Sequence, residues 1–310
     1  MAVAPALEFD LSRLLCIAGL LLFPMMGRAQ HHVVIVQGLG GETVYAEQFT
    51  TQVASIETAS QSVAGKNNVH VLRGAAASRG AVLDRLQRLS ETADLAQLTV
   101  YLIGHGSYDD HDYKFNLPGP DLTGADIAHA LDQITTDSIV LVNTSSASGA
   151  LAELVQKDRR VIALATRSGS ERHATRFGVF FAEALANETA DVNKSKTVSV
   201  AEAFGYAQRQ VADYFERNGQ LATEHAVLHG ERADRIALAR LSKRVPRPAT
   251  GRLADLLEQR DTLSAEIDAL RLTRGEQSPL DYQEALMPKL LELARLEGAI
   301  EAEQQETADD

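Results

Sequence analysis

The sequence is short of cysteine and of positive charge, and each shortage excludes a class of function. Its 310 residues contain one cysteine, Cys16, in an N-terminal segment that we expect to be removed. A mature chain without cysteine has no disulfide, no thiolate nucleophile and no cysteine-based zinc site. Asp and Glu number 42 against 30 Lys and Arg, a formal net charge of −12. Because like charges repel and no basic cluster stands out, nucleic acids and anionic membranes are not expected partners.

The apolar content is large enough for a folded chain. Residues of hydrophobic type make up 45% of the sequence, which argues against wholesale disorder. A chain of this length can bury a sizeable core, in one large domain or in two.

The N-terminus resembles an export signal. Leu14–Met26 is an apolar run of 13 residues, too short to span a bilayer comfortably. Gly27 and Ala29 then place small residues where signal peptidase requires them. We therefore expect residues 1–29 to be a signal peptide, and the mature chain to be periplasmic or secreted in a bacterium, without a stable membrane span. The acidic residues near the start leave an uncleaved anchor as the alternative.

Beyond this segment, short apolar runs alternate with helical patterns. Five strands are predicted, at His32–Gln37, Asn68–Arg73, Leu98–Ile103, Ser138–Val142 and Val161–Ala165. Helices are predicted at Thr43–Ile56, Ala77–Leu89, Leu122–Ile134, Ser148–Val155, Ala174–Ala186 and Val200–Arg217. Nearly continuous apolar strands separated by helices predict a three-layer α/β/α sandwich with a mostly parallel sheet. The carboxyl ends of the strands then meet at one edge, where ligand sites form.

The C-terminal part differs in composition from the rest. Residues 242–250 are basic and contain proline, which is typical of a linker, so the α/β domain is predicted at 30–241. Residues 251–310 carry −9 of the net charge of −12. Leucines and isoleucines recur there at spacings of three and four on both sides of a break at Gly275–Pro279. This pattern predicts a helical hairpin with a coiled-coil-like seam at 251–304 and an acidic tail at 305–310.

Two predicted strand ends carry residues suited to catalysis. One strand ends in Gly104-His105-Gly106, and the next ends in Asn143-Thr144-Ser145-Ser146-Ala147-Ser148-Gly149. A histidine at one strand end and a nucleophile at the next can converge on one substrate carbonyl. The amide of Gly106 could then approach an oxyanion, because glycine has no side chain. The serines could instead simply cap the following helix.

These two motifs resemble those of the caspase/legumain-type cysteine peptidases, and most of all the legumain-like group. Val100–Gly106 (VYLIGHG) matches the family's strand that ends in His-Gly. Ile139–Gly149 (IVLVNTSSASG) matches the frame of its later strand, which ends in Ala-Cys-x-Ser-Gly. The similarity extends over about Val33–Leu228, one α/β domain, and does not include the C-terminal hairpin. It implies a peptidase-like fold, with His105 at the histidine position and Ser146 at the nucleophile position.

The serine at position 146 is the departure that decides the expected chemistry. A thiol is partly ionised and intrinsically nucleophilic, whereas a hydroxyl needs a base in hydrogen-bond contact and usually a third group that orients the base. The resemblance therefore implies a domain that has lost peptidase activity and binds or scaffolds a peptide or protein. A serine hydrolase with a Ser146–His105 dyad, helped by Asp109, Asp110 or Asp112, is one alternative. A structural protein that assembles or oligomerises through its hairpin is another.

Two arginines are candidates for substrate binding. Arg167 follows the fifth strand, and Arg73 ends the second. Either guanidinium could recognise an acidic or carboxamide side chain, although a surface salt bridge would explain each equally well. No metal site is predicted, because the adjacent residues Asp109–Asp112 have no matching distant cluster. No cofactor is predicted either, since the Gly38–Gly41 turn lacks a nucleotide-binding frame.

Overall fold

The computed structural model describes residues 30–241, 251–272 and 277–309, so the predicted signal peptide and linker lie outside the described residues. Its centre is a six-stranded sheet in the order β10-β8-β7-β3-β1-β2. The strands are β1 (Gln30–Gln37), β2 (Val69–Leu72), β3 (Leu95–Ile103), β7 (Ser138–Asn143), β8 (Arg160–Leu164) and β10 (Val227–His229). Every neighbouring pair is parallel except the edge strand β10, which runs antiparallel to β8.

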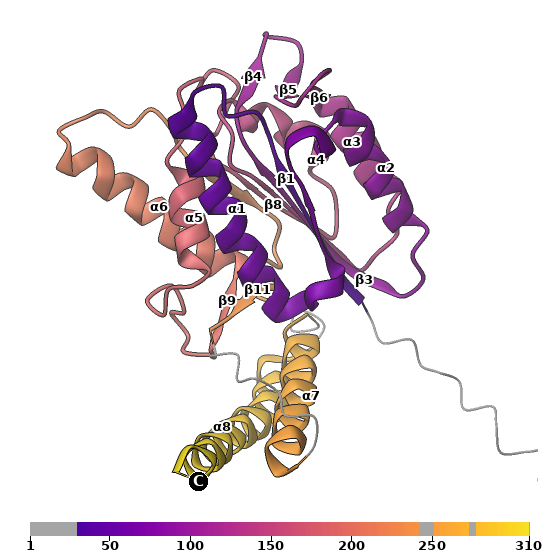
Figure 1. Cartoon of the computed structure of the whole chain (residues 1–310), viewed down its shortest axis with the longest axis vertical. Helices are drawn as coiled ribbons and strands as arrows, with labels where there is room; N and C mark the ends of the chain where they lie inside the picture. The colour runs from indigo at the N-terminus through magenta and orange to yellow at the C-terminus, as the bar shows by residue number, and fades with distance from the viewer. Residues whose placement is uncertain (1–29, 242–250, 273–276, 310) are drawn as a thin grey trace, which may run out of the picture.

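Helices cover both faces of this sheet (Figure 1). One face carries α1 (Thr43–Ala64), α5 (Phe177–Ala184) and α6 (Val200–Arg217), and the other carries α2 (Arg79–Ser90), α3 (Gly124–Asp132) and α4 (Ala152–Val155). Alternate residues of β1 enter the two cores: Val33 and Ile35 pack on the first side, Val34 and Val36 on the second. This explains why the strands are apolar throughout, and it confirms the predicted α/β architecture.

Small antiparallel sheets were not predicted from the sequence. β4 (Gly106–Tyr108), β5 (Tyr113–Phe115) and β6 (Leu122–Thr123) form one, and β9 (Thr197–Ser199) pairs with β11 (Ala237–Arg240) in another. A helix predicted from Leu122 therefore begins only at Gly124, after β6. Thr123 caps it, and the Asp126 side chain bonds back to the amide of Thr123 in a capping box. Two- to four-residue strands are too short to produce a periodic signal.

The C-terminal residues form the predicted pair of helices, α7 (Arg252–Leu272) and α8 (Pro279–Asp309), which pack along each other. Leu263, Ile267 and Ile300 of the expected seam are buried, together with Leu257. α8 continues through Pro288 and through residues 305–309, where the sequence predicted a tail. Figure 1 shows the hairpin at the opposite end of the sheet from β4–β6. None of the helices in the described ranges is both long and apolar enough to cross a bilayer.

Three histidines lie together near the amino-terminal ends of β1 and β2. His32 Nε2 lies 2.9 Å from Gln30 Oε1, which can only accept, so this nitrogen carries the proton. His32 Nδ1 then accepts from His70 Nε2 at 3.1 Å. Burial is the main cause that lowers the pKa of His31 to about 3 and, together with Arg85, that of His70 to about 4. The pKa of His32 is lowered for the same reasons. All three are therefore neutral in the folded protein at neutral pH.

We expect the free energy of unfolding to fall as the pH drops from 6.5 to 5. The unfolded chain protonates these histidines near pH 6.5, while the folded chain resists until the lower pKa values, so stability present above pH 6.5 is lost below it. Each histidine contributes at most about 1.4 kcal/mol per pH unit. Urea unfolding at pH 7.5, 6 and 5 measures this, and a double His31→Gln, His70→Gln variant should lose most of the slope. An unchanged slope would contradict the assignment.

Candidate functional site

The sheet order brings His105 and Ser146 to the same edge. β3 and β7 are parallel neighbours, with Leu102 beside Asn143 in the register. His105 follows β3 by two residues and Ser146 follows β7 by three. Both residues thus lie at the carboxyl edge of the sheet, on loops from adjacent strands, and β4–β6 lie at this edge (Figure 1).

His105 is oriented by a backbone carbonyl rather than by a carboxylate. Its Nε2 lies 3.2 Å from the carbonyl oxygen of Gly40, and the rings of Tyr45 and Phe49 stand edge-on to it at centroid distances of 4.8 and 5.1 Å. Because a carbonyl only accepts, Nε2 carries the proton and Nδ1 keeps a lone pair. The Gly38–Gly41 turn therefore anchors the histidine. Gly40 must be small, since a Cβ there would lie 2.6 Å from the amide of Ala46.

Gly106 turns both of its backbone polar groups away from β5. The amide of Asn116 donates to the carbonyl of His105, which makes Gly106 and Phe115 a pair that exchanges no hydrogen bonds in the ladder. The amide and carbonyl of Gly106 therefore face outward from this small sheet. A Cβ on Gly106 would lie 2.5 Å from Ser145 Oγ and 2.6 Å from the Ser146 carbonyl. Glycine is required here because the end of β7 approaches so closely.

The hydroxyl of Ser146 is engaged by the backbone and not by the histidine. Ser146 Oγ donates to the carbonyl of Gly106 at 3.1 Å, and the residue is only 4% exposed. Within the described part of the chain, Ser146 and His105 share no hydrogen bond. A carbonyl oxygen accepts this hydrogen bond but is too weak a base to remove the proton, so the arrangement lacks the contact that activates a nucleophilic hydroxyl.

A buried polar chain fixes the backbone on which Ser146 sits. Asn143 Nδ2 donates to Tyr113 Oη at 2.8 Å, leaving the tyrosine to donate to Ser145 Oγ at 2.7 Å and Ser145 Oγ to donate to the Ser146 carbonyl at 3.2 Å. Asn143 Oδ1 in turn accepts from the amide of Ser145. Burial raises the pKa of Tyr113 to about 12. No pattern in the sequence indicated Tyr113, because it reaches the site from the unpredicted strand β5.

The loop after β8 packs directly on the residues that follow Ser146. A Cβ on Gly149 would lie 2.1 Å from the amide of Ser168, so the two backbones touch. Ser148 Oγ accepts from the amide of Thr166, and the amide of Ala147 donates to the carbonyl of Glu171 at 2.8 Å. The serine at 148 therefore bonds to a neighbouring loop instead of capping a helix.

The two candidate arginines lie on opposite sides of the site. Arg167 follows β8, is largely exposed and pairs with Glu171 at 3.2 Å. Arg73 is exposed at the end of β2. β8 and β2 are four strand positions apart, about 19 Å, so the structure does not bring the arginines together. Glu171 is the better-connected residue, since its carboxylate also accepts from His225 Nδ1 at 2.7 Å. No pattern in the sequence indicated that Glu171 would connect Arg167 to His225.

The acidic loop at 109–112 is the turn between β4 and β5. Asp109 accepts from the amides of His111 and Asp112 and from Lys114, and these bonds, that with Lys114 first, lower its pKa. Asp110 pairs with Arg172 at 2.8 Å. No grouping of His, Cys, Asp and Glu suited to a metal ion occurs among the described residues. The carboxylates of Asp109 and Asp110 are thus bound to cations, and among the described residues the ring of His105 is hydrogen-bonded to the Gly40 carbonyl and to neither of them.

Comparison with known proteins finds similarity among solved structures. No family model matches the chain, and no curated protein matches it. Among solved structures, the chain is similar to caspase-1 from Spodoptera frugiperda at 10% sequence identity and a TM-score of 0.44. The match covers 70% of this chain and 92% of that one. We take no residue role or activity from a match at this level.

The Tyr113→Phe variant should be destabilised by about 1–3 kcal/mol, because it leaves the buried Asn143 amide and Ser145 hydroxyl without their shared partner. Chemical denaturation measures the loss. Tyr108→Phe is the matched control, since that hydroxyl makes no hydrogen bond within residues 30–241, and it should cost far less. Equal effects of the two substitutions would show that the polar chain contributes nothing.

Proposed function

We propose that the chain is an exported binding module that has the architecture of a peptidase of the caspase/legumain type but not its chemistry, and that it holds a peptide or protein segment at the carboxyl edge of its sheet. The observation that carries the proposal is the hydrogen bond from Ser146 Oγ to the carbonyl of Gly106. It commits the hydroxyl proton to an acceptor that cannot remove it. The cysteine position of the family motif is thus occupied by a group that is neither ionised nor activated.

The features needed for recognition are present at the same edge. The outward-facing amide of Gly106 is available to an acceptor on a ligand, since it takes no part in the β4–β5 ladder. Leu39, within the turn that anchors His105, and Val44, at the start of α1, are large apolar residues that are 46% and 60% exposed. Exposed apolar side chains beside a backbone donor are suited to an extended segment, whose main chain bonds while its side chains fill apolar positions.

A serine hydrolase is the second candidate, and the state of His105 favours it. With Nε2 held by Gly40, the lone pair of Nδ1 is the one that could accept a proton, and the carbonyl supplies the orienting partner that a base needs. A rotation of the Ser146 side chain away from Gly106 would then be required. This candidate predicts that a fluorophosphonate labels wild-type protein at Ser146 and fails to label the His105→Ala variant; we expect neither protein to be labelled.

The Ser146→Cys variant tests whether only the sulfur was lost. In a Cys16→Ser background we expect this variant to react with a peptidyl acyloxymethyl ketone, because a thiolate needs less help from a base than a hydroxyl does. Ser145→Cys is the matched control, since position 145 is fully buried in the polar chain and should stay unreactive. If Ser146→Cys reacts no faster than Ser145→Cys, the carboxyl edge of the sheet does not accept a peptide and the proposal fails.

Binding itself is expected to depend on the apolar pair. A Leu39→Asp, Val44→Asp double variant should lose affinity at least tenfold for peptides selected from a displayed library on the wild-type protein, since burial of both side chains contributes roughly 1.5 kcal/mol or more. Both side chains are exposed, so the variant should fold as the wild type does. Affinity is measured by fluorescence anisotropy. Selected peptides that bind the variant equally well would place their site elsewhere.

A further inference from the structure

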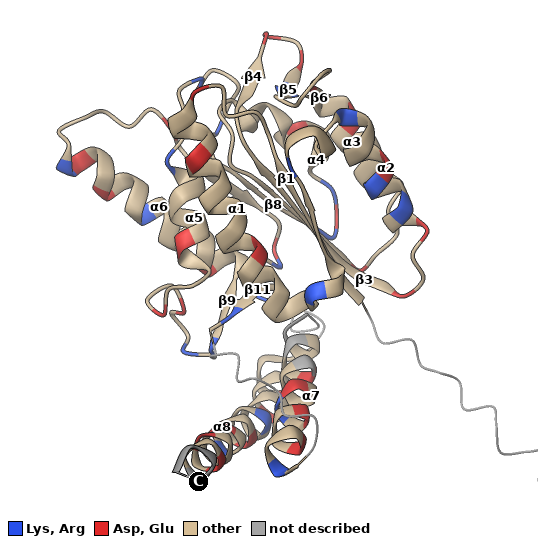
Figure 2. Cartoon of the chain, viewed as in Figure 1, with Lys and Arg blue, Asp and Glu red and all other residues tan. Residues whose placement is uncertain are grey.

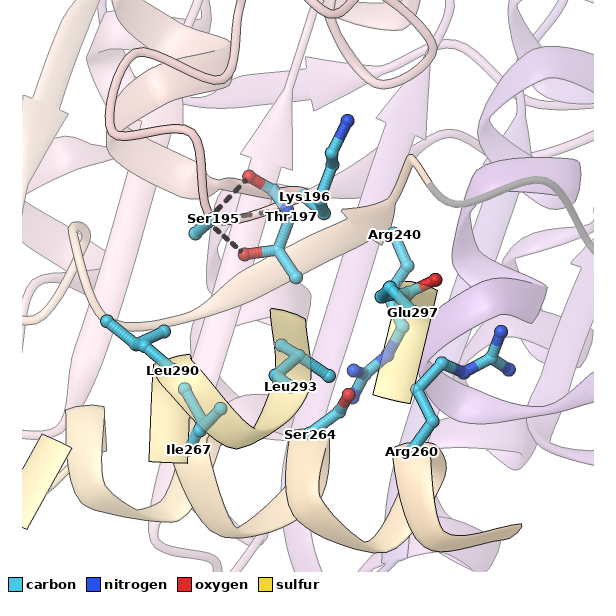
Figure 3. Close-up of a pocket in the computed structure, with 10 residues that line it drawn as sticks. All are labelled: Ser195, Lys196, Thr197, Arg240, Arg260, Ser264, Ile267, Leu290, Leu293 and Glu297. Atoms are coloured by element: carbon cyan, nitrogen blue, oxygen red, sulfur yellow. Dashed lines mark hydrogen bonds between the residues drawn. The ribbon is translucent and has the colours of Figure 1, made fainter. Parts of the chain in front are cut away.

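A cleft separates the α/β part of the chain from α8, far from the site described above. It encloses about 910 Å³ and is walled by the loop 192–196, the first turns of α6 and residues 282–301 of α8. A narrow extension lies against α7, and both spaces share Ser195, Lys196, Leu290, Leu293 and Glu297. Figure 3 shows the extension, with the leucines of α8 below the Ser195–Thr197 backbone. A volume of this size is in the range of small-molecule sites.

The wall contributed by the α/β part is cationic. The side chains of Lys194, Lys196 and Arg209 form no hydrogen bond or ion pair with any residue in the described ranges, and all three line the cleft. The Arg209 guanidinium extends over Gly205, where a Cβ would meet it at 3.3 Å. Arg235 Nε is buried without a hydrogen-bond partner. The cleft therefore presents positive groups whose charge is not neutralised by hydrogen-bonded partners.

The acidic residues on the same wall are already in use. The Glu202 carboxylate accepts from the amide and hydroxyl of Ser199 at 2.9 and 2.8 Å and from the amide of Asn193 at 3.3 Å. Asp234 lies 3.7 Å from Arg235 Nε. Within the described ranges neither carboxylate forms an ion pair with Lys194, Lys196 or Arg209, so the charge of these three remains available to a ligand, whereas Arg235 shares its charge with Asp234.

The loop that carries the lysines is rigidly built. Asp191 is 3% exposed, and its carboxylate accepts from the amides of Ser195 and Lys196, each at 2.9 Å. Lys194 and Lys196 have φ angles of 58° and 61°, a left-handed conformation that side-chain-bearing residues rarely adopt. A buried carboxylate thus fixes the backbone of the loop that places both lysines along the cleft.

The opposite wall is apolar. Leu286, Leu290 and Leu293 follow one another at helical spacing on α8, and Tyr282 extends the row by one turn. From Leu286 to Leu293 the row runs about 10 Å along the helix axis. Glu297 and Glu301 follow only in the next turns, towards the carboxyl end of α8. An apolar row thus faces a cationic wall across the same space.

We propose that this cleft binds an anionic amphiphile: an alkyl chain that lies along the leucine row of α8, with a carboxylate or phosphate head that is held by Arg209, Arg235 and the lysines. The anionic head and the cationic side chains attract each other, and the alkyl chain covers leucines that water would otherwise contact. The cleft is independent of the carboxyl edge that carries His105 and Ser146, because the hairpin and that edge lie at opposite ends of the sheet (Figure 1).

The test is isothermal titration of the full chain with dodecanoate and with dodecyl phosphate below their micelle concentrations, and with dodecyltrimethylammonium as the matched cation. We expect saturable binding of the anions and none of the cation. Which anion binds more tightly distinguishes a fatty acid from a phosphate head. Arg209→Gln combined with Arg235→Gln should weaken anion binding at least tenfold and leave the unfolding transition in place.

Gly205→Leu provides a second variant that blocks the cleft without threatening the fold. Leucine is a better helix former than glycine, and its side chain would project into the space beneath Arg209. Binding should be lost, whereas Gln208→Leu, on an exposed part of α6 outside the cleft, should bind as the wild type does. Equal binding of the cationic amphiphile, or binding that survives Gly205→Leu, would overturn the proposal. A Gly205→Leu variant that changes a dimer into a monomer would instead identify a second copy as the occupant.

Discussion

The contact between Gly106 and the end of β7 is the constraint on which the rest of the carboxyl edge depends. Without a side chain, Gly106 lets the backbone after β3 approach the Ser145–Ser146 segment to within van der Waals distance. Its carbonyl then accepts the hydrogen bond from Ser146 Oγ, and its amide makes no hydrogen bond to β5. One residue thus holds the Ser146 hydroxyl in a hydrogen bond and turns a backbone amide away from the β4–β5 ladder. Any larger residue would separate the two strand ends and open the site.

The rigidity of this edge comes from buried polar bonds rather than from apolar packing alone. A directional chain of hydrogen bonds links Asn143, Tyr113 and Ser145. Each buried polar group in it has a partner, so none is left desolvated without a hydrogen bond. The loop after β8 adds a second support through Glu171, which bonds to the backbone beside Ser146 and to His225. Such a site holds one arrangement well, which suits recognition of a ligand better than the movements of a catalytic serine.

The charge of the chain is distributed in a way that separates its two ends. The hairpin carries most of the negative charge (Figure 2), while Lys194, Lys196 and Arg209 of the α/β part line the cleft between the two. The carboxyl edge of the sheet, where His105 and Ser146 lie, is at the other end and combines apolar side chains with a backbone donor. The two surfaces therefore differ in physical character: one presents apolar side chains and a backbone donor, and the other presents cationic side chains opposite an apolar row.

The sequence by itself determined the five parallel strands and the helices between them, the burial of both sheet faces and the placement of His105 and Ser146 at one edge of the sheet, because periodicity and chain order are local properties. The capping box of Thr123 and Asp126 is local in the same way, since its members are three residues apart. Only the tertiary structure decided which group accepts the hydrogen bond from Ser146, which group orients His105, and whether Tyr113 belongs to the site. Those partners are 40, 65 and 30 or more positions away along the chain. Contacts of that range depend on strand register and backbone approach within a few tenths of an ångström, which no spacing in the sequence encodes.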